Sequence, residues 1–268
     1  MKRVQEDHYS QDYDYRVGSP HLKHHHLYES LMRRITDEVS KVSPKNRPTV
    51  VEVGDGDGSI TERLLALGCE VTGTDMSRDS ISKMDSKFRV NDRFHGVHDP
   101  EGNLTVLGES RYDVIIYSSV LHHIPDYLRH LTLAIDHHLK PGGSLVSIQD
   151  PLWYSRVSKW SRRATGAAYM SWRLGQGELG RGVKTRVRRM VSGPSEEEPG
   201  DAVEYHVVRN GVDEDAISIM LNDQFDSVEL RKYWSSQGTV QQKFGEKLGM
   251  VNTFAIFATG FDAESASA

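Results

Sequence analysis

Glycines and acids alternate over one short segment of the chain, Glu52–Gly58. Glycines let a loop turn tightly and let its backbone approach a ligand closely. A pyrophosphate placed on this loop would meet like charges, because Glu52, Asp55 and Asp57 all lie within it. The spacing therefore favours a positively charged nucleoside, with an ammonium or a sulfonium group and no phosphate.

Three of the thirteen histidines are candidates for proton transfer. His122 and His123 follow the apolar segment Tyr112–Ser118, and His206 lies within Glu204–Arg209. An imidazole with a pKa near 6.5 can take a proton from a hydroxyl or phenol group near neutral pH. The alternative role of these histidines is structural, in capping the next helix or packing beneath the neighbouring segment.

Polar and aromatic side chains follow the apolar segment that ends at Gln149. Asp150, Trp153 and Tyr154 emerge there, and the two aromatic rings could hold a flat acceptor between them. Packing of an inserted segment is the other explanation for these rings.

A cluster of histidines near the N-terminus has the spacing of a metal site on a helix. His21, His24, His25 and His26 could place two imidazoles on one face. No carboxylate or cysteine accompanies them at ligand spacing, so we predict no metal.

Strands and helices alternate before residue 150, after one amphipathic helix at 21–40. A capping box of Ser59 and Glu62 is expected to begin the first helix of this alternation. The pattern predicts a parallel sheet with right-handed crossovers and helices on both faces. The expected strands are 49–53, 70–75, 93–99, 112–118 and 144–149, and the expected helices are 59–67, 77–87 and 127–139.

The alternation stops at Asp150. Residues 151–206 lack a clean period and carry three of the four tryptophans and a basic cluster beside an acidic loop. This cluster is either a solvated face or an attraction for an anionic acceptor. A helix at 213–225 and strands at 227–233 and 252–259 follow. The predicted divisions are 1–47, an arm and helix; 48–150, the core; 151–206, a substrate-binding cap; and 207–262, the completion of the core.

Composition limits the class of protein. The 268 residues carry a net charge of -5, which gives no global field for nucleic acid, and no apolar run is long enough to span a membrane. Cys69, the single cysteine, cannot form an internal disulfide. We therefore expect a cytoplasmic protein with a small-molecule acceptor and neither nucleic acid nor membrane as partner; a homo-oligomer is left open.

The glycine-rich segment resembles the first motif of class I S-adenosylmethionine (SAM)-dependent methyltransferases. Asp75 matches the acid that binds the ribose hydroxyls in that family, Met76 matches the neighbour of the adenine, and Asp99 would lie near the adenine amino group. The resemblance covers residues 48–150, and it implies SAM as the cofactor. Apart from the resemblance, Tyr9, Tyr13 and Tyr15 of the N-terminal arm are expected to fold over the bound cofactor as a lid. The residues expected to bind the cofactor are Glu52, Gly54, Asp55, Gly56, Gly58, Asp75, Met76, Asp99, Ser118 and Tyr15.

The resemblance implies a Rossmann-like α/β fold, with a mostly parallel sheet and an antiparallel last strand. The residue pattern outside 48–150 adds an N-terminal helical arm and a cap inserted after the fifth strand. It further implies O- or C-methylation of a small organic acceptor, similar to bacterial methyltransferases of secondary metabolism. Ser118–Leu121 lacks the Asn-Pro-Pro-aromatic motif of enzymes that methylate adenine or glutamine. A SAM-bound cyclase, a nicotinamide oxidoreductase and a silent partner in an oligomeric enzyme remain as alternatives.

Overall fold

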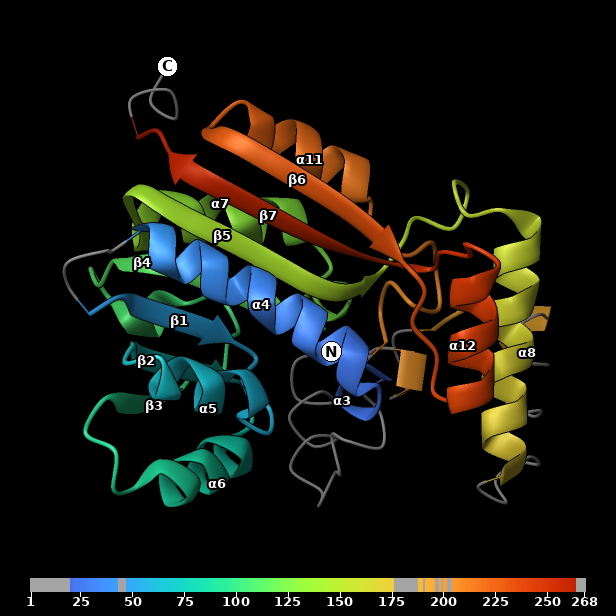
Figure 1. The fold of residues 1–268 in the computed structure, drawn as a ribbon, viewed down its shortest axis with the longest axis horizontal. Helices are drawn as coiled ribbons and strands as arrows, with labels where there is room; N and C mark the ends of the chain where they lie inside the picture. The colour runs from blue at the N-terminus through green and yellow to red at the C-terminus, as the bar shows by residue number, and fades with distance from the viewer. Residues whose placement is uncertain are drawn as a thin grey trace.

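Seven strands form one sheet in the described part of the chain (Figure 1). The computed structural model describes residues 20–42, 47–175, 188–189, 191–195, 198, 200–201 and 204–263. The strand order is β3-β2-β1-β4-β5-β7-β6, and β7 runs antiparallel to both of its neighbours. The strands are β1 (Thr49–Val53), β2 (Glu70–Asp75), β3 (Phe94–His98), β4 (Tyr112–Ser118), β5 (Leu139–Pro151), β6 (Phe225–Tyr233) and β7 (Thr253–Phe261). The predicted mostly parallel sheet with an antiparallel last strand is confirmed.

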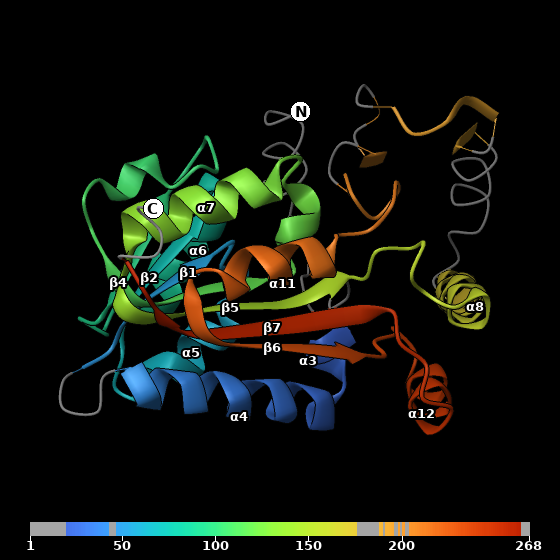
Figure 2. The ribbon, with the colours of Figure 1, turned by 90° about the horizontal axis from the view of Figure 1, so that it is seen from above.

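Helices cover both faces of this sheet. Figure 2 shows α4 on one face and α7 and α11 on the other. The helices are α3 (Pro20–Lys23), α4 (His25–Val42), α5 (Ser59–Ala66), α6 (Arg78–Phe88), α7 (Tyr127–His138), α8 (Lys159–Gly175), α11 (Glu214–Asn222) and α12 (Thr239–Lys247), with 3₁₀ turns η1 (Thr105–Leu107) and η2 (Leu121–His123). Two buried apolar clusters result, because alternate strand residues point to opposite faces: Ile115 packs in one cluster and Ile116 in the other.

The start of α5 differs from the prediction. Gly58 is the N-cap, in a left-handed conformation that glycine adopts easily, and Ser59 is already the first helical residue. The hydroxyl of Ser59 donates to Asp57 Oδ1 at 2.5 Å, and Glu62 pairs instead with Lys87 at 3.1 Å. The predicted capping box was therefore wrong, because the helix begins one residue earlier than the box requires.

The part of the chain after β5 contains two helices that the sequence did not indicate, α8 and α12. They lie side by side beyond the end of the sheet (Figures 1 and 2). Their buried positions include Ser161 and Ala168 in α8 and Gln242 and Gly245 in α12. Small and polar residues at buried positions hide the apolar period by which a helix is recognised in a sequence.

The N-terminal helix is interrupted near its start. His24 separates α3 from α4, and its Nε2 hydrogen bonds to the carbonyl of Ser236 at 2.8 Å. Tyr9, Tyr13 and Tyr15, the predicted lid, lie outside the described residues.

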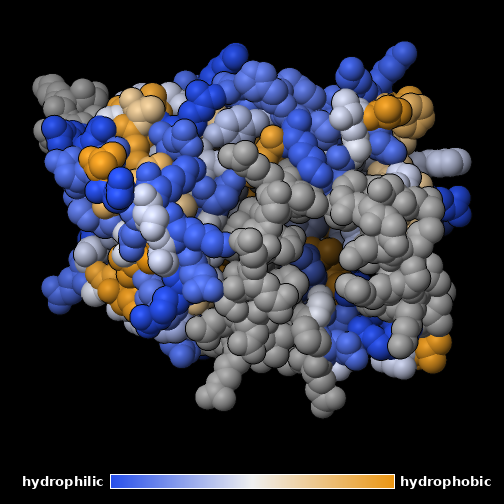
Figure 3. Space-filling model, turned by 90° about the horizontal axis from the view of Figure 1, so that it is seen from below, coloured by the Kyte–Doolittle hydropathy of each residue, from blue (hydrophilic) through white to orange (hydrophobic). Residues whose placement is uncertain are grey.

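The described surface in Figure 3 is mostly hydrophilic, with apolar residues in separate small patches. No helix within the described residues combines the length and the apolar composition needed to cross a membrane.

Candidate functional site

The glycine-rich loop connects β1 to α5 and packs against the segment that follows β4. Gly54, Gly56 and Gly58 all have positive φ angles, between 60° and 69°. A Cβ atom at Gly54 would lie 2.5 Å from Val120 Cγ2, and one at Gly58 would lie 2.5 Å from Met84 Cε. These two glycines are therefore required by both conformation and space.

Two buried carboxyl groups, those of Glu52 and Asp55, meet beneath this loop. The Thr61 hydroxyl lies 2.8 Å from Glu52 Oε2 and 3.2 Å from Asp55 Oδ2, and it has one proton to donate. Burial, followed by the charge of Asp55, raises the pKa of Glu52 well above its usual value, and burial raises the pKa of Asp55 to about 7. Both carboxyl groups therefore ionise less readily than a carboxyl group in water, and a nearby cation would stabilise their ionised form.

The next strand ends in the acid predicted to bind ribose. Asp75 Oδ1 accepts from the backbone N–H of Ser77 at 2.7 Å, and Oδ2 accepts from that of Gly56 at 3.3 Å. Burial raises the pKa of this carboxyl to about 6. The side chain thereby ties the end of β2 to the glycine-rich loop. Met76 follows directly, and its carbonyl hydrogen bonds to His98 Nε2 at 3.1 Å.

Asp99 follows β3 and is 1% exposed. Its Oδ2 accepts from the backbone N–H of Leu104 at 2.8 Å. Its Oδ1, like Oδ1 of Asp55, has no hydrogen-bond partner in the part of the chain that the structure describes. Buried acceptors of this kind need donors. SAM carries an ammonium group, an adenine amino group and a sulfonium charge, so the acids of this region fit SAM and do not fit a phosphate.

The segment after β4 joins the loop to the predicted histidines. Ser118 ends the strand half-buried, and Ser119, with a φ of 61°, donates its N–H to the carbonyl of Ile148 at 2.8 Å. Val120, the residue that excludes a Cβ atom at Gly54, comes next. His122 and His123 are therefore two and three residues beyond a direct contact with the glycine-rich loop.

His122 is held by Asp150, which is fully buried on β5. Its Nδ1 lies 2.8 Å from Asp150 Oδ1, and the same oxygen accepts from the His122 backbone N–H at 3.0 Å. Burial alone would lower the pKa of His122, but the hydrogen bond and charge of Asp150, with the charge of Glu204, outweigh burial and raise it. The rings of His122 and His123 are 3.9 Å apart between centroids. Asp150 is thus a partner of His122, whereas the sequence indicated it as a contact for the acceptor.

His206 is brought to the same place by its backbone. Its N–H donates to the carbonyl of His122 at 2.9 Å, and its Nε2 donates to the carbonyl of Ile124 at 3.0 Å. Burial lowers the pKa of His206, which favours the neutral form of the ring. Because Nε2 carries the proton of that hydrogen bond, Nδ1 is left with the lone pair.

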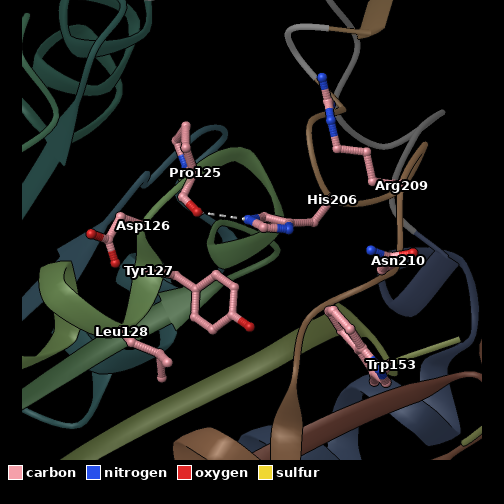
Figure 4. Close-up of a pocket in the computed structure, with 8 residues that line it drawn as sticks. All are labelled: Pro125, Asp126, Tyr127, Leu128, Trp153, His206, Arg209 and Asn210. Carbon is pink, nitrogen blue, oxygen red and sulfur yellow. Dashed lines mark hydrogen bonds between the residues drawn. The ribbon is translucent and has the colours of Figure 1, made fainter. Parts of the chain in front are cut away.

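A cavity of about 260 Å³ adjoins His206. Figure 4 shows His206, Tyr127 and Trp153 around it, with Arg209 and Asn210 on the same chain segment as His206. The cavity therefore includes one of the two aromatic residues predicted to contact the acceptor. The other, Tyr154, donates its hydroxyl to the carbonyl of Val207 at 2.7 Å, and burial raises its pKa.

Three described arginines of the basic cluster are paired with acids. Arg188 and Arg189 each contact the buried Asp201 at 2.6 Å. Arg156 pairs with Glu214 at 3.1 Å and also with Asp213. These guanidinium groups hold the chain together after β5, which weakens the alternative that they attract an anionic acceptor.

Sequence reasoning missed Glu204 as a site residue. Its Oε2 lies 3.8 Å from His122 Nε2, although 82 residues separate the two in the chain. No local pattern marks a glutamate of this kind, because only the folded turn at 204–210 brings it to His122.

The strand order, the reversed β7 and the glycine-rich loop after β1 define the class I methyltransferase fold. Among solved structures, the chain is similar to the CurJ carbon methyltransferase, with a TM-score of 0.53 and 20% identity over 87% of this chain and 54% of that one. It is also similar to the N-methyltransferase NodS from Bradyrhizobium japonicum WM9, solved with S-adenosyl-L-homocysteine, with a TM-score of 0.52 and 16% identity over 96% of this chain and 97% of that one.

Residues 51–145 match the methyltransferase domain family. A curated relative, the ubiquinone biosynthesis O-methyltransferase of Xylella fastidiosa (strain 9a5c), is 31% identical over 114 residues, which span 41% of this chain and 44% of that protein. The match therefore covers less than half of this relative. The predicted resemblance is confirmed: the segment that carries the loop matches the methyltransferase domain family, the fold is that of class I enzymes, and these matches support SAM as the cofactor.

Proposed function

We propose that the chain transfers the methyl group of SAM to a small organic acceptor. The observation that carries the proposal is the buried acidic pair of Glu52 and Asp55 beneath a loop of positive-φ glycines. A cationic nucleoside bound here would stabilise the ionised form of this pair, whereas the charge of a dinucleotide phosphate would oppose its ionisation. The pair therefore favours methyl transfer over nicotinamide chemistry.

Asp75 and Asp99, at the carboxyl ends of β2 and β3, are further acids that complement the hydrogen-bond donors of SAM. Asp75 is expected to accept hydrogen bonds from the ribose hydroxyls, and the orphaned Oδ1 of Asp99 to accept one from the adenine amino group. Met76 and Ser118 are expected to border the nucleoside. Ligands in open α/β sheets bind at this edge, where neighbouring strands diverge.

When bound, SAM supplies a methyl carbon attached to a positively charged sulfur, which departs as a neutral thioether. The chain has to align the acceptor, keep water away and receive the acceptor's proton. His206 suits the last task, because its Nε2–H is fixed on a backbone carbonyl and its Nδ1 lone pair can accept a proton. His122, His123 and Asp150 border the same region, so we place the acceptor among these residues.

The acceptor is proposed to be flat and to carry a hydroxyl group. The cavity of about 260 Å³ has Trp153 and Tyr127 in its wall, and aromatic rings bind planar groups well. Residues 151–206 would serve as the cap over this acceptor, and a metabolite of secondary metabolism is the corresponding expectation.

Calorimetry with S-adenosylhomocysteine tests the cofactor half of the proposal. We expect the parent chain to bind it, and Glu52→Gln and Asp75→Asn to weaken binding at least tenfold. The matched controls Glu62→Gln and Asp79→Asn change exposed acids of α5 and α6 and should leave affinity unchanged. Binding of NAD or NADP without binding of S-adenosylhomocysteine would reverse the assignment.

Turnover with a panel of phenolic acceptors tests the second half. We expect S-adenosylhomocysteine to accumulate in proportion to methylated acceptor, and His206→Asn to lower kcat at unchanged cofactor affinity. Conversion of the acceptor without release of S-adenosylhomocysteine would instead indicate a cyclase or a related non-methylating enzyme. Binding without any turnover would favour a silent partner in an oligomeric enzyme.

A further inference from the structure

Two imidazoles and one carboxylate converge beside the proposed acceptor cavity. The ligand atoms of His122, His123 and Glu204 lie within 4.8 Å of one another. His122 is buried, and the other two side chains are half-buried. Within the described residues, these side chains form the one group of three with metal-binding atoms this close together. The N-terminal histidines His24, His25 and His26 do not form such a group.

Asp150 prepares His122 for this role. Because Nδ1–H of His122 donates to the carboxylate of Asp150, the lone pair of the ring is on Nε2, the nitrogen 3.8 Å from Glu204 Oε2. A carboxylate behind the coordinating histidine is the usual second layer of a protein metal site, since it fixes the tautomer and orients the ring. The Ser147 hydroxyl supports this carboxylate in turn, at 3.2 Å from Asp150 Oδ2.

The turn that carries Glu204 is fixed to the histidine segment. The N–H of His206 donates to the carbonyl of His122, and His206 Nε2 donates to the carbonyl of Ile124. The carbonyls of His122 and Ile124 therefore fix the position of His206, which is two residues from Glu204. The approach of Glu204 to the histidines follows from these hydrogen bonds and does not depend on an exposed ion pair alone.

We propose that His122, His123 and Glu204 bind one divalent transition-metal ion of the nitrogen-preferring kind, such as Zn²⁺. Two imidazoles and a carboxylate are a ligand set of three-ligand zinc sites, whereas Mg²⁺ and Ca²⁺ prefer oxygen ligands. Bonds of about 2.1 Å at tetrahedral angles separate two donor atoms by about 3.4 Å. The observed 3.8 Å between His122 and Glu204 is near this value, and rotation of the half-buried side chains can close the wider separations.

A bound ion would have a position left for water or for an oxygen of the acceptor, because the chain supplies three ligands. The inference goes beyond methyl transfer and does not require it. It assigns His122 and His123 to the ion and leaves His206 as the proton acceptor.

The test uses the full chain after treatment with a chelator. Titration with Zn²⁺ by calorimetry, and with Co²⁺ by visible absorption, should show one ion per chain and the absorption bands of a low-symmetry Co²⁺ site. We expect His123→Ala and Glu204→Gln to weaken Zn²⁺ binding at least tenfold. The controls His137→Ala and Glu109→Gln remove an exposed histidine and an exposed glutamate elsewhere and should bind Zn²⁺ as the parent does.

Circular dichroism and S-adenosylhomocysteine binding report on the fold of each variant. The proposal is overturned if the parent binds no Zn²⁺, or if folded Glu204→Gln and His123→Ala bind it as tightly as the parent. S-adenosylhomocysteine binding by the metal-free parent separates this outcome from the proposed function. If the metal-free parent binds S-adenosylhomocysteine but no Zn²⁺, only the proposed zinc site is wrong. If it does not bind S-adenosylhomocysteine, the proposed methyl transfer is wrong, whatever the zinc result.

Discussion

The two halves of the candidate site are built in different ways. The cofactor half uses backbone conformation and acids that follow consecutive strands, as in Glu52–Gly58 after β1 and Asp75 at the end of β2. The histidine half joins three segments far apart in the chain, at His122, Asp150 and Glu204. The first half depends on local sequence, and the second depends on tertiary contacts. A substitution in the cofactor half should therefore affect cofactor affinity, and one in the histidine half should affect zinc affinity. A substitution where the two halves are in contact should affect both.

Gly54 and Val120 are the point of contact, and Gly54→Ala should have the largest effect. An added Cβ atom would lie 2.5 Å from Val120 Cγ2, on a backbone with a φ of 69° that alanine adopts at a cost of about 1 kcal/mol. We expect loss of S-adenosylhomocysteine binding by about 100-fold, loss of Zn²⁺ binding, and a lower melting temperature.

The double variant Gly54→Ala/Val120→Ala separates the collision from the backbone strain. Removal of the Val120 methyl groups should restore most of the zinc affinity, while the strained loop keeps the cofactor affinity low. If the double variant is no better than Gly54→Ala in either assay, the two halves are not coupled through this contact.

Asp150→Asn should affect the histidine half alone. The asparagine amide keeps the size of the side chain but removes the charge, so the orientation and tautomer of His122 are no longer enforced. Substitutions behind a metal ligand typically cost 10-fold to 100-fold in metal affinity. We expect this loss for Zn²⁺, with cofactor affinity within twofold of the parent. Asp136→Asn, an exposed change on α7, is the control; equal effects of the two variants would contradict the role given to Asp150.

Asp55→Asn should affect the cofactor half, in a way that depends on pH. Burial raises the pKa of Asp55 to about 7, against about 3.9 in an unfolded chain. Between these values the folded protein retains a proton that the unfolded chain releases, so this carboxyl makes the free energy of unfolding fall as pH rises from about 4 to 7. Asparagine cannot ionise and removes this dependence.

The variant should therefore gain stability relative to the parent across that pH range, by about 1–3 kcal/mol at pH 8. Its affinity for SAM should fall, because asparagine cannot supply the carboxylate that the bound cation would stabilise. Urea unfolding at several pH values gives the first quantity and calorimetry the second. A constant stability difference between the variant and the parent from pH 4 to pH 8 would mean that Asp55 ionises normally.

The same division explains what the sequence could predict. The strands β1 to β4 and the loop Glu52–Gly58 are local patterns of apolar periods, glycines and acids, and they occur where expected. β5 contains the expected 144–149 but begins earlier, at Leu139, where the end of a helix was predicted. Glu204 could not be found, because nothing in its neighbourhood in the sequence refers to His122. The helices α8 and α12 were missed because residues such as Ala168 and Gly245 occupy their buried positions. Gly245 is needed there, since a Cβ atom would lie 2.4 Å from the ring of Trp234.

Ser147→Ala is expected to have the smallest effect and tests how far the histidine half extends. The Ser147 hydroxyl donates to Asp150 Oδ2, the oxygen that does not contact His122. Its removal leaves a buried carboxylate oxygen with one fewer donor, which should cost about 1–2 kcal/mol of stability. His122 keeps its own hydrogen bond to Oδ1, so zinc affinity should fall no more than about fivefold and cofactor affinity should stay constant. Ser144→Ala, on the same strand and also fully buried, is the matched control in both assays. A loss of zinc affinity as large as that of Asp150→Asn would show that Ser147, and not the contact with His122, sets the position of the carboxylate.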